Sequence, residues 1–181
     1  MNIAVDTVKY IPLAGDGMEY KIEDGIARFT EDVDIFNVDC IPKVQSTFNT
    51  FFKLEPSVKS IVWGQFNDVD NRNFIITEPT FISSDDTDFL SCIDPYGNYD
   101  YEDYEREFGI QNEPKDLFMG HAYLSSKFEF YRYGINYNNC RAIVNLLSSK
   151  KFHTIFNDML GCNVKVICIR DGFVCKACEY D

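Results

Sequence analysis

The sequence predicts an α+β fold, in which a mostly antiparallel sheet of hairpins packs against two to four helices. Three observations favour this class. Short segments with alternating apolar side chains lie toward both ends of the chain, Asp-Gly and similar turn residues separate several of them, and segments with helical apolar spacing lie between. With 181 residues, 45% of them hydrophobic, the chain can bury a core as one domain, residues 1–181.

The N-terminal third is expected to begin with strands. Residues 3–13 have strand character and end at a Gly-Asp-Gly turn, and residues 18–30 form the clearest hairpin. Asp24-Gly25 supplies the positive φ angles of a type I′ turn. That turn sets two apolar pairs opposite each other: Tyr20 with Phe29, and Ile22 with Ala27.

Four further strands are expected before the helical region, at 61–66, 73–77, 80–83 and 122–133. The last rests on Phe128 and Phe130, which alternate with charged neighbours. The chain is expected to finish with a hairpin over 164–178 that turns at Asp171-Gly172.

Apolar residues at helical spacing predict three helices. The first covers 42–52, with Pro42 at its first position. The second is capped by Asn138 or Asn139, and its apolar face is Cys140, Ile143, Val144 and Leu147. The third ends at Gly161, and its apolar face is Phe152, Ile155, Phe156, Met159 and Leu160.

The chain carries a strong and uneven negative charge. The net charge is −12; residues 1–118 hold 24 acidic and 9 basic side chains, and residues 119–181 hold 5 and 8. Nucleic-acid binding requires Lys and Arg against the phosphates, so no direct binding to nucleic acid is expected. Opposite fields steer association, which favours a basic protein partner, although simple solubility would give the same composition.

The acidic, tyrosine-rich segment 85–108 is the main candidate site, and we expect it to be a surface insertion in the domain. It holds nine acids and one base, with tyrosines between them. Spaced carboxylates can take the place of phosphates in a basic groove, and tyrosine is frequent at interfaces. The alternative is a solvated loop whose tyrosines pack back onto the domain. The candidate partner-binding residues are Asp94, Tyr96, Tyr99, Asp100, Tyr101, Glu102, Asp103, Tyr104, Glu105 and Glu107.

The sequence predicts no cofactor. A calcium loop counted from Asp94 would place Tyr99 at the position that requires glycine. A zinc site is the alternative for four cysteines near the C-terminus, which include one C-x-x-C pair. These are Cys162, Cys168, Cys175 and Cys178, and burial in the core is the competing interpretation.

The alternative function is a small hydrolase that uses a Cys/His pair or a carboxylate-bound metal. Cys140 would be the nucleophile, His121 or His153 the base, and an acid such as Asp158 would orient the histidine. Cys140 also lies on the apolar face of its helix, which favours core packing instead. Motifs for phosphate loops, serine hydrolases and zinc proteases are absent from the sequence.

These patterns lead us to expect a cytoplasmic binding or inhibitory protein with a basic partner. No signal peptide or membrane-spanning segment is expected. A nuclease or another nucleic-acid-binding protein would be engaged by nucleic-acid mimicry. Suitable classes are phage-encoded inhibitors of a host defence system and immunity proteins against nuclease toxins.

Overall fold

The computed structural model of the chain describes residues 8–12, 20–23, 26–29, 40–68, 70, 72–99, 102, 106, 117–122, 125 and 127–178. Its centre is a seven-stranded sheet with the strand order β1-β9-β8-β4-β6-β7, in which β5 also pairs with β4. All the pairings are antiparallel. The strands are β1 (Val8–Pro12), β4 (Ser60–Asp68), β5 (Asn73–Ile76), β6 (Thr80–Ile82), β7 (Met119–His121), β8 (Val164–Ile169) and β9 (Gly172–Ala177).

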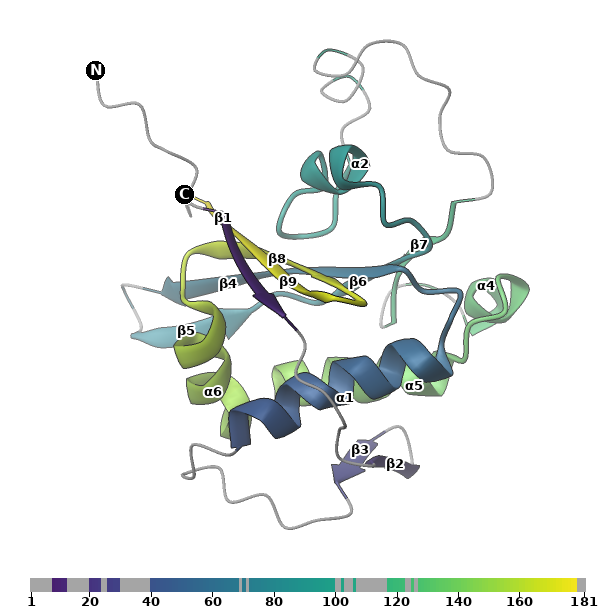
Figure 1. Cartoon of the computed structure of the whole chain (residues 1–181), viewed down its shortest axis with the longest axis horizontal. Coiled ribbons are helices and arrows are strands. Elements are labelled where there is room, and N and C mark those ends of the chain that lie inside the picture. Colours follow the sequence, from purple (N-terminus) through teal and green to yellow (C-terminus); the bar gives the residue numbers. More distant parts are fainter. Residues whose placement is uncertain are drawn as a thin grey trace.

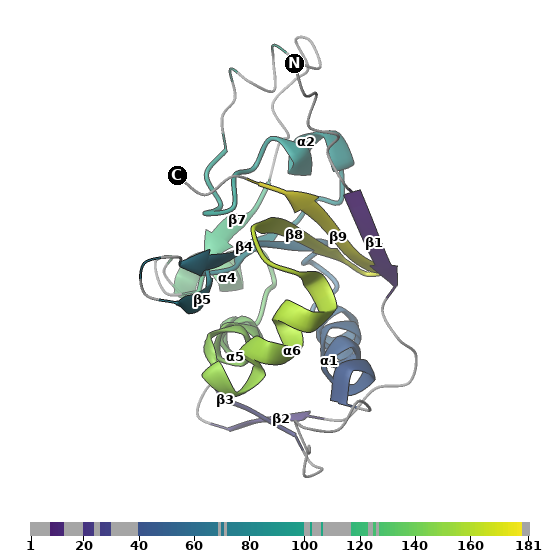
Figure 2. The ribbon, with the colours of Figure 1, turned by 90° about the vertical axis from the view of Figure 1, so that its left-hand side faces the viewer.

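Helices lie on both faces of this sheet, as Figure 1 shows. One face is covered by α1 (Cys40–Leu54), α5 (Tyr137–Ser148) and α6 (Lys150–Leu160), and the short α2 (Thr87–Ser91) lies over the other. The hairpin of β2 (Tyr20–Glu23) and β3 (Ile26–Phe29) lies beside α5, below the helical layer in Figure 2. The α+β class predicted from the sequence is confirmed. None of the helices described is long and apolar enough to cross a membrane.

The central strand β4 is buried on both of its faces. Ile61 and Trp63 belong to the large core under α1, α5 and α6, whereas Val62 belongs to a smaller core under α2. The ring of Trp63 stacks on Phe48 of α1 with 5.8 Å between ring centroids. This double burial explains why β4 has a continuous apolar run and not simple alternation.

Two buried polar side chains bind helix ends to the rest of the fold. Glu55, 3% exposed, follows α1 and accepts hydrogen bonds from the backbone N–H of Asn136, at 3.0 Å, and from the side chain of Asn139. Gln65 of β4 donates to the carbonyl of Gly161, at 2.7 Å, where α6 ends. Buried polar groups stabilise a fold only when they are paired in this way.

Several sequence predictions agree with the structure. The first hairpin pairs Tyr20 with Phe29 and Ile22 with Ala27, as the proposed turn requires, although Asp24 and Gly25 themselves lie outside the described residues. The strands expected at 61–66, 73–77 and 80–83 are β4, β5 and β6. All nine residues of the apolar faces predicted for the second and third helices are buried.

The strand expected at 122–133 is wrong. Residues 119–121 form the short strand β7, but Lys127–Arg132 form the helix α4. Phe130 is fully buried and Phe128 is 74% exposed, so the two rings do not share a face. Gly134, at φ +71°, ends the helix: its N–H donates to the carbonyl of Tyr131, and the N–H of Ile135 donates to that of Phe130.

Three local expectations need smaller corrections. Helix α1 begins at Cys40, so Pro42 is its third residue, still within the turn where a missing N–H has no effect. Helix α5 is capped by Asn136, whose side chain accepts from the N–H of Asn138 at 3.0 Å. In the last hairpin Ile169 pairs with Gly172, so the turn residues are Arg170 and Asp171.

Candidate interaction surface

The described part of the acidic segment folds over the sheet face opposite the helical layer. Its first element is α2, which Asp86 caps by accepting from the N–H groups of Asp88, at 2.9 Å, and Phe89, at 3.2 Å. Phe89 and Leu90 of α2 are buried against the sheet. Asp85, Asp86 and Asp88 are consequently held together at the exposed start of a fixed helix.

A buried lysine attaches the far end of α2 to the sheet. Lys165 of β8 is 7% exposed, and its ammonium group donates to the carbonyls of Ser91, at 2.9 Å, and Ile93, at 2.8 Å. It also donates to that of Leu90 at 3.3 Å. Burial is the largest cause that lowers the pKa of Lys165 to about 8, and the neighbouring charge of Lys176 adds to it. By binding these carbonyls, Lys165 fixes the end of α2 and so helps to position the acidic residues on either side of that helix.

Residues 94–99 form a compact turn built around one carboxylate. The side chain of Asp94 accepts from the N–H groups of Tyr96 and Asn98, each at 2.8 Å, and from the amide of Asn98 at 2.9 Å. The hydroxyl of Thr77 donates to the carbonyl of Pro95 at 2.6 Å, which ties the turn to the sheet. The carboxylate of Asp94 thus has a structural role in addition to its charge.

Glycine allows this turn to lie directly on the sheet. Gly97 has φ +81°, and a Cβ there would overlap the hydroxyl of Thr80 and lie 2.7 Å from His121 Cε1. Thr80 and His121 are cross-strand partners on β6 and β7, and the hydroxyl lies 3.3 Å from His121 Nε2. The backbone of the acidic turn therefore packs on His121 itself.

Gly97→Ala is expected to lower the free energy of unfolding by about 2 kcal/mol, because the new methyl group adds a clash to an unfavourable positive φ. Gly134→Ala is the matched control. Gly134 also has positive φ, but the nearest atom to a Cβ there is Ser57 Oγ at 3.7 Å, so only the backbone cost of about 1 kcal/mol is expected. Urea denaturation of both variants measures the difference, and equal losses would contradict the close packing of the turn.

Tyr96 and Tyr99 take different positions. Tyr96 is 49% exposed and its ring stacks on Phe66, with 6.1 Å between centroids. Tyr99 is half-buried and packs on Phe89 with 4.8 Å between centroids. Tyr96 is therefore presented to solvent, whereas Tyr99 packs back onto the domain.

The structure places only some of the candidate partner-binding residues. Asp94, Tyr96 and Tyr99 lie together in the turn, and Glu102 is exposed. The remaining candidates lie outside the described residues: Asp100, Tyr101, Asp103, Tyr104, Glu105 and Glu107. Sequence reasoning missed α2 and Lys165. The signals were an Asp-Asp pair before Phe89-Leu90, typical of a helix cap, and a single lysine within an apolar strand.

The segment that lies over the α2 face of the sheet is acidic, whereas the strands beneath it carry Lys165 and Lys176. Residues 84–99, over one face, contain four acids and no base. Asp85, Asp86 and Asp88 are exposed, and the carboxylate of Asp94 interacts electrostatically with Lys165. On the other side, α4, α5 and α6 carry more bases than acids: Lys127, Arg132, Arg141, Lys150 and Lys151 against Glu129 and Asp158.

The residues of the hydrolase alternative do not form a catalytic arrangement. Cys140 is fully buried in the core between helices and sheet, and burial, with the charge of Glu55, raises the pKa of its thiol well above the usual value. A nucleophilic cysteine needs the opposite shift. Neither His121 nor His153 hydrogen-bonds to Cys140, and Asp158 is exposed on α6.

The four C-terminal cysteines are distributed over both faces of the sheet. Cys168 and Cys175 are buried in the large core, where burial raises the pKa of Cys168 well above its usual value. Cys178 lies near Lys165 on the α2 side, and Cys162 is half-buried before β8. Among the residues that the structure describes, no group of three or more His, Cys, Asp or Glu side chains could hold a metal ion.

Comparison with known proteins gives no family for this chain. No protein-family model, curated protein or solved structure matches it.

Proposed function

We propose that the protein is an acidic binding protein that uses the α2 side of its sheet to engage a basic protein partner. The observation that carries the proposal is the concentration of acids: residues 84–99 hold four acids and no base, and Asp85, Asp86 and Asp88 are exposed together at the start of α2. Exposed charged groups remain available to a partner and steer its approach.

The form of this surface suits a preorganised binder. Asp86 fixes the start of α2, Lys165 fixes its end, and Asp94 closes the following turn. Tyr96 is exposed beside these carboxylates and already stacked on Phe66, so its ring loses little freedom on binding. Rigid acids with an aromatic side chain between them are well matched to Arg and Lys in a groove.

A nuclease or another nucleic-acid-binding protein is the partner class that this chemistry suits best. The groove of such a protein presents spaced cations to phosphates. The carboxylates of Asp85, Asp86, Asp88 and Asp94, which together with Tyr96 form the α2 surface, would take the place of those phosphates. Acting in the cytoplasm, such a protein would be an inhibitor, for example a phage-encoded one directed at a host defence system, or an immunity protein against a nuclease toxin.

The test is binding to a panel of purified nucleases and nucleic-acid-binding domains with basic grooves. We expect binding that weakens as salt rises and that duplex DNA or RNA competes away. The triple substitution Asp85→Asn, Asp86→Asn and Asp88→Asn should weaken binding by about tenfold or more. Asparagine at position 86 still caps α2, so the fold is retained.

The matched control is Asp70→Asn, Asp158→Asn and Asp171→Asn, which changes the net charge equally at three exposed sites outside the α2 surface. Its affinity is expected to stay within about twofold of wild type, because surface charges far from a contact are largely screened. Equal losses in both triple variants would mean that net charge, and not this surface, drives binding. Failure to bind any member of the panel would overturn the partner class.

A further inference from the structure

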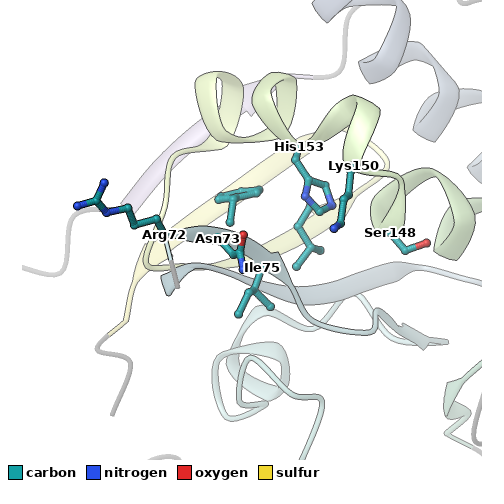
Figure 3. A pocket seen from close by; sticks show the side chains of 8 residues that line it. Arg72, Asn73, Ile75, Ser148, Lys150 and His153 are labelled. Atoms are coloured by element: carbon teal, nitrogen blue, oxygen red, sulfur yellow. The ribbon is translucent and has the colours of Figure 1, made fainter. Parts of the chain in front are cut away.

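A cavity on the opposite side of the sheet lies between β5 and the junction of α5 and α6. Its volume is about 470 Å³, and its lining includes the whole of β5 together with Ser148, Lys150 and His153 (Figure 3). The His153 ring stands edge-on to Phe74 with 5.6 Å between centroids, and its Nε2 is buried without a hydrogen-bond partner. The cavity therefore lies between an apolar strand and the side of the His153 ring.

Strand β5 forms one wall of the cavity, and the edge of β5 that faces away from β4 is open in the described structure. Within the described structure it pairs only with β4, and its sequence, Asn73–Ile76, contains no proline or charged residue that would block an added strand. Its three apolar residues are only half-buried. An uncovered apolar edge of this kind accepts an additional strand through its backbone.

The register shows which backbone groups are available. The N–H of Thr77 donates to the carbonyl of Gly64 at 2.9 Å, which places Thr77 in a hydrogen-bonded pair position with β4. Because such positions alternate along an antiparallel strand, Ile75 also turns its backbone toward β4. Phe74 and Ile76 then turn their N–H and C=O groups outward, along the open edge.

The charge of the cavity selects among peptides. Of the eight residues that line it, Arg72 and Lys150 are cationic and none is acidic. In Figure 3 the side chains of Lys150 and His153 lie over β5, whereas Arg72 extends away from them. The positive charge above the strand is therefore that of Lys150.

We propose that β5 binds an extended acidic peptide segment of a partner protein, which pairs with the backbone of Phe74 and Ile76 and places one Asp or Glu side chain beside Lys150. Four residues of strand span about 13 Å, so a segment of about five residues fills the edge. Side chains of an added strand alternate between the two faces of the sheet, and only every second one points toward the helices. This site is separate from the α2 surface.

The probes are short fluorescent peptides in which valine alternates with glutamate, with matched peptides that carry glutamine or lysine instead. The glutamate peptide is expected to bind and to shift the backbone amide signals of Asn73–Ile76 in NMR spectra. Methylating the peptide's backbone nitrogens that face β5 should abolish binding, since strand addition depends on those donors. The lysine peptide should not bind.

Two substitutions in the first turn of α6 complete the test. Lys150→Glu should weaken binding of the glutamate peptide by about tenfold, because an attractive charge becomes a repulsive one. Lys151→Glu changes the same charge on an exposed neighbour that does not line the cavity, and should leave affinity within about twofold. The triple asparagine variant of the α2 surface should bind the peptide normally, which separates this site from the proposed function.

Several results would overturn the proposal. These are no binding by any glutamate peptide, equal binding of methylated and unmethylated peptides, or equal effects of the two lysine substitutions. Shifts at β5 produced by free glutamate alone would assign the cavity to small anions. Concentration-dependent dimers with the same amide shifts would assign the edge to a second copy of the chain.

Discussion

Phe130→Ala is expected to lower the free energy of unfolding by about 3–4 kcal/mol, the usual range for removing a fully buried aromatic ring. The ring of Phe130 is completely buried and lies 4.8 Å from that of Phe118 and 5.3 Å from that of Tyr137, measured between centroids. Truncation removes these ring contacts and leaves a cavity where α4 meets the sheet. Urea denaturation measures the loss. If the slope of the unfolding free energy against urea concentration is unchanged, the substitution has altered stability alone.

Phe128→Ala is the matched control, since it removes the same ring two residues away. Phe128 is 74% exposed on α4, and its truncation should change stability by less than about 0.5 kcal/mol. In a strand the two rings would point to the same face, and both substitutions would be costly. Similar losses in the two variants would therefore support a strand and contradict the helix.

The failure of the sequence at α4 has a definite physical cause. A helix of six residues makes fewer than two turns, too few to distinguish a period of 3.6 residues from a period of 2. The better signal lay outside the alternation, at Gly134. Glycine after a helix adopts the positive φ that lets the following N–H groups bond to the last carbonyls, and Gly134 and Ile135 make both bonds.

Elements with longer patterns were predictable because several signals agreed. Helices α5 and α6 each make about three turns, and each helix ends where a cap or glycine lies. The last hairpin shows how an error can be harmless. Its pairing is shifted by two residues from the expected register, and an even shift keeps every side chain on its face, so Cys168 and Cys175 are still buried together.

The candidate surface was predictable in its charge but not in its geometry. The acids of 85–99 are visible in the sequence, yet the capping role of Asp86 and the turn around Asp94 depend on backbone positions that only the fold sets. The same holds for the cavity beside β5. Lys150 and Phe74 are far apart in the chain, and no periodicity indicates that their segments meet at one open edge.

The second large effect that we predict is a change in the free energy of unfolding with pH, caused by Lys165. Its pKa is about 8 in the folded protein, mainly because burial disfavours the charged amine, whereas the usual value is 10.5. Between these two values the unfolded chain binds more protons than the folded protein, so the free energy of unfolding rises with pH. The rise due to Lys165 is expected to reach at most about 3 kcal/mol and to be complete above the unfolded value.

The measurement is urea denaturation of wild type and Lys165→Met at several pH values from 7 to 10, with a reductant present. Burial also raises the pKa of the thiols of Cys140 and Cys168, which lowers the stability of both proteins at high pH. That contribution cancels in the difference between the two curves. The difference should therefore grow in favour of wild type as pH increases, and parallel curves would show that Lys165 titrates normally.

Lys176→Met tests the cause of the shift and connects it to the acidic surface. Lys176 pairs with Lys165 across β8 and β9, and its charge contributes to the lowered pKa. Without that charge the pKa of Lys165 should rise, and the gain in stability should begin at higher pH. The Lys165 amine donates to the carbonyls at the end of α2, so the protection factors of the α2 amides, which correct for the intrinsic rise of exchange with pH, should follow the same titration. Protection factors in α2 that stay constant across this pH range would contradict the positioning role of Lys165.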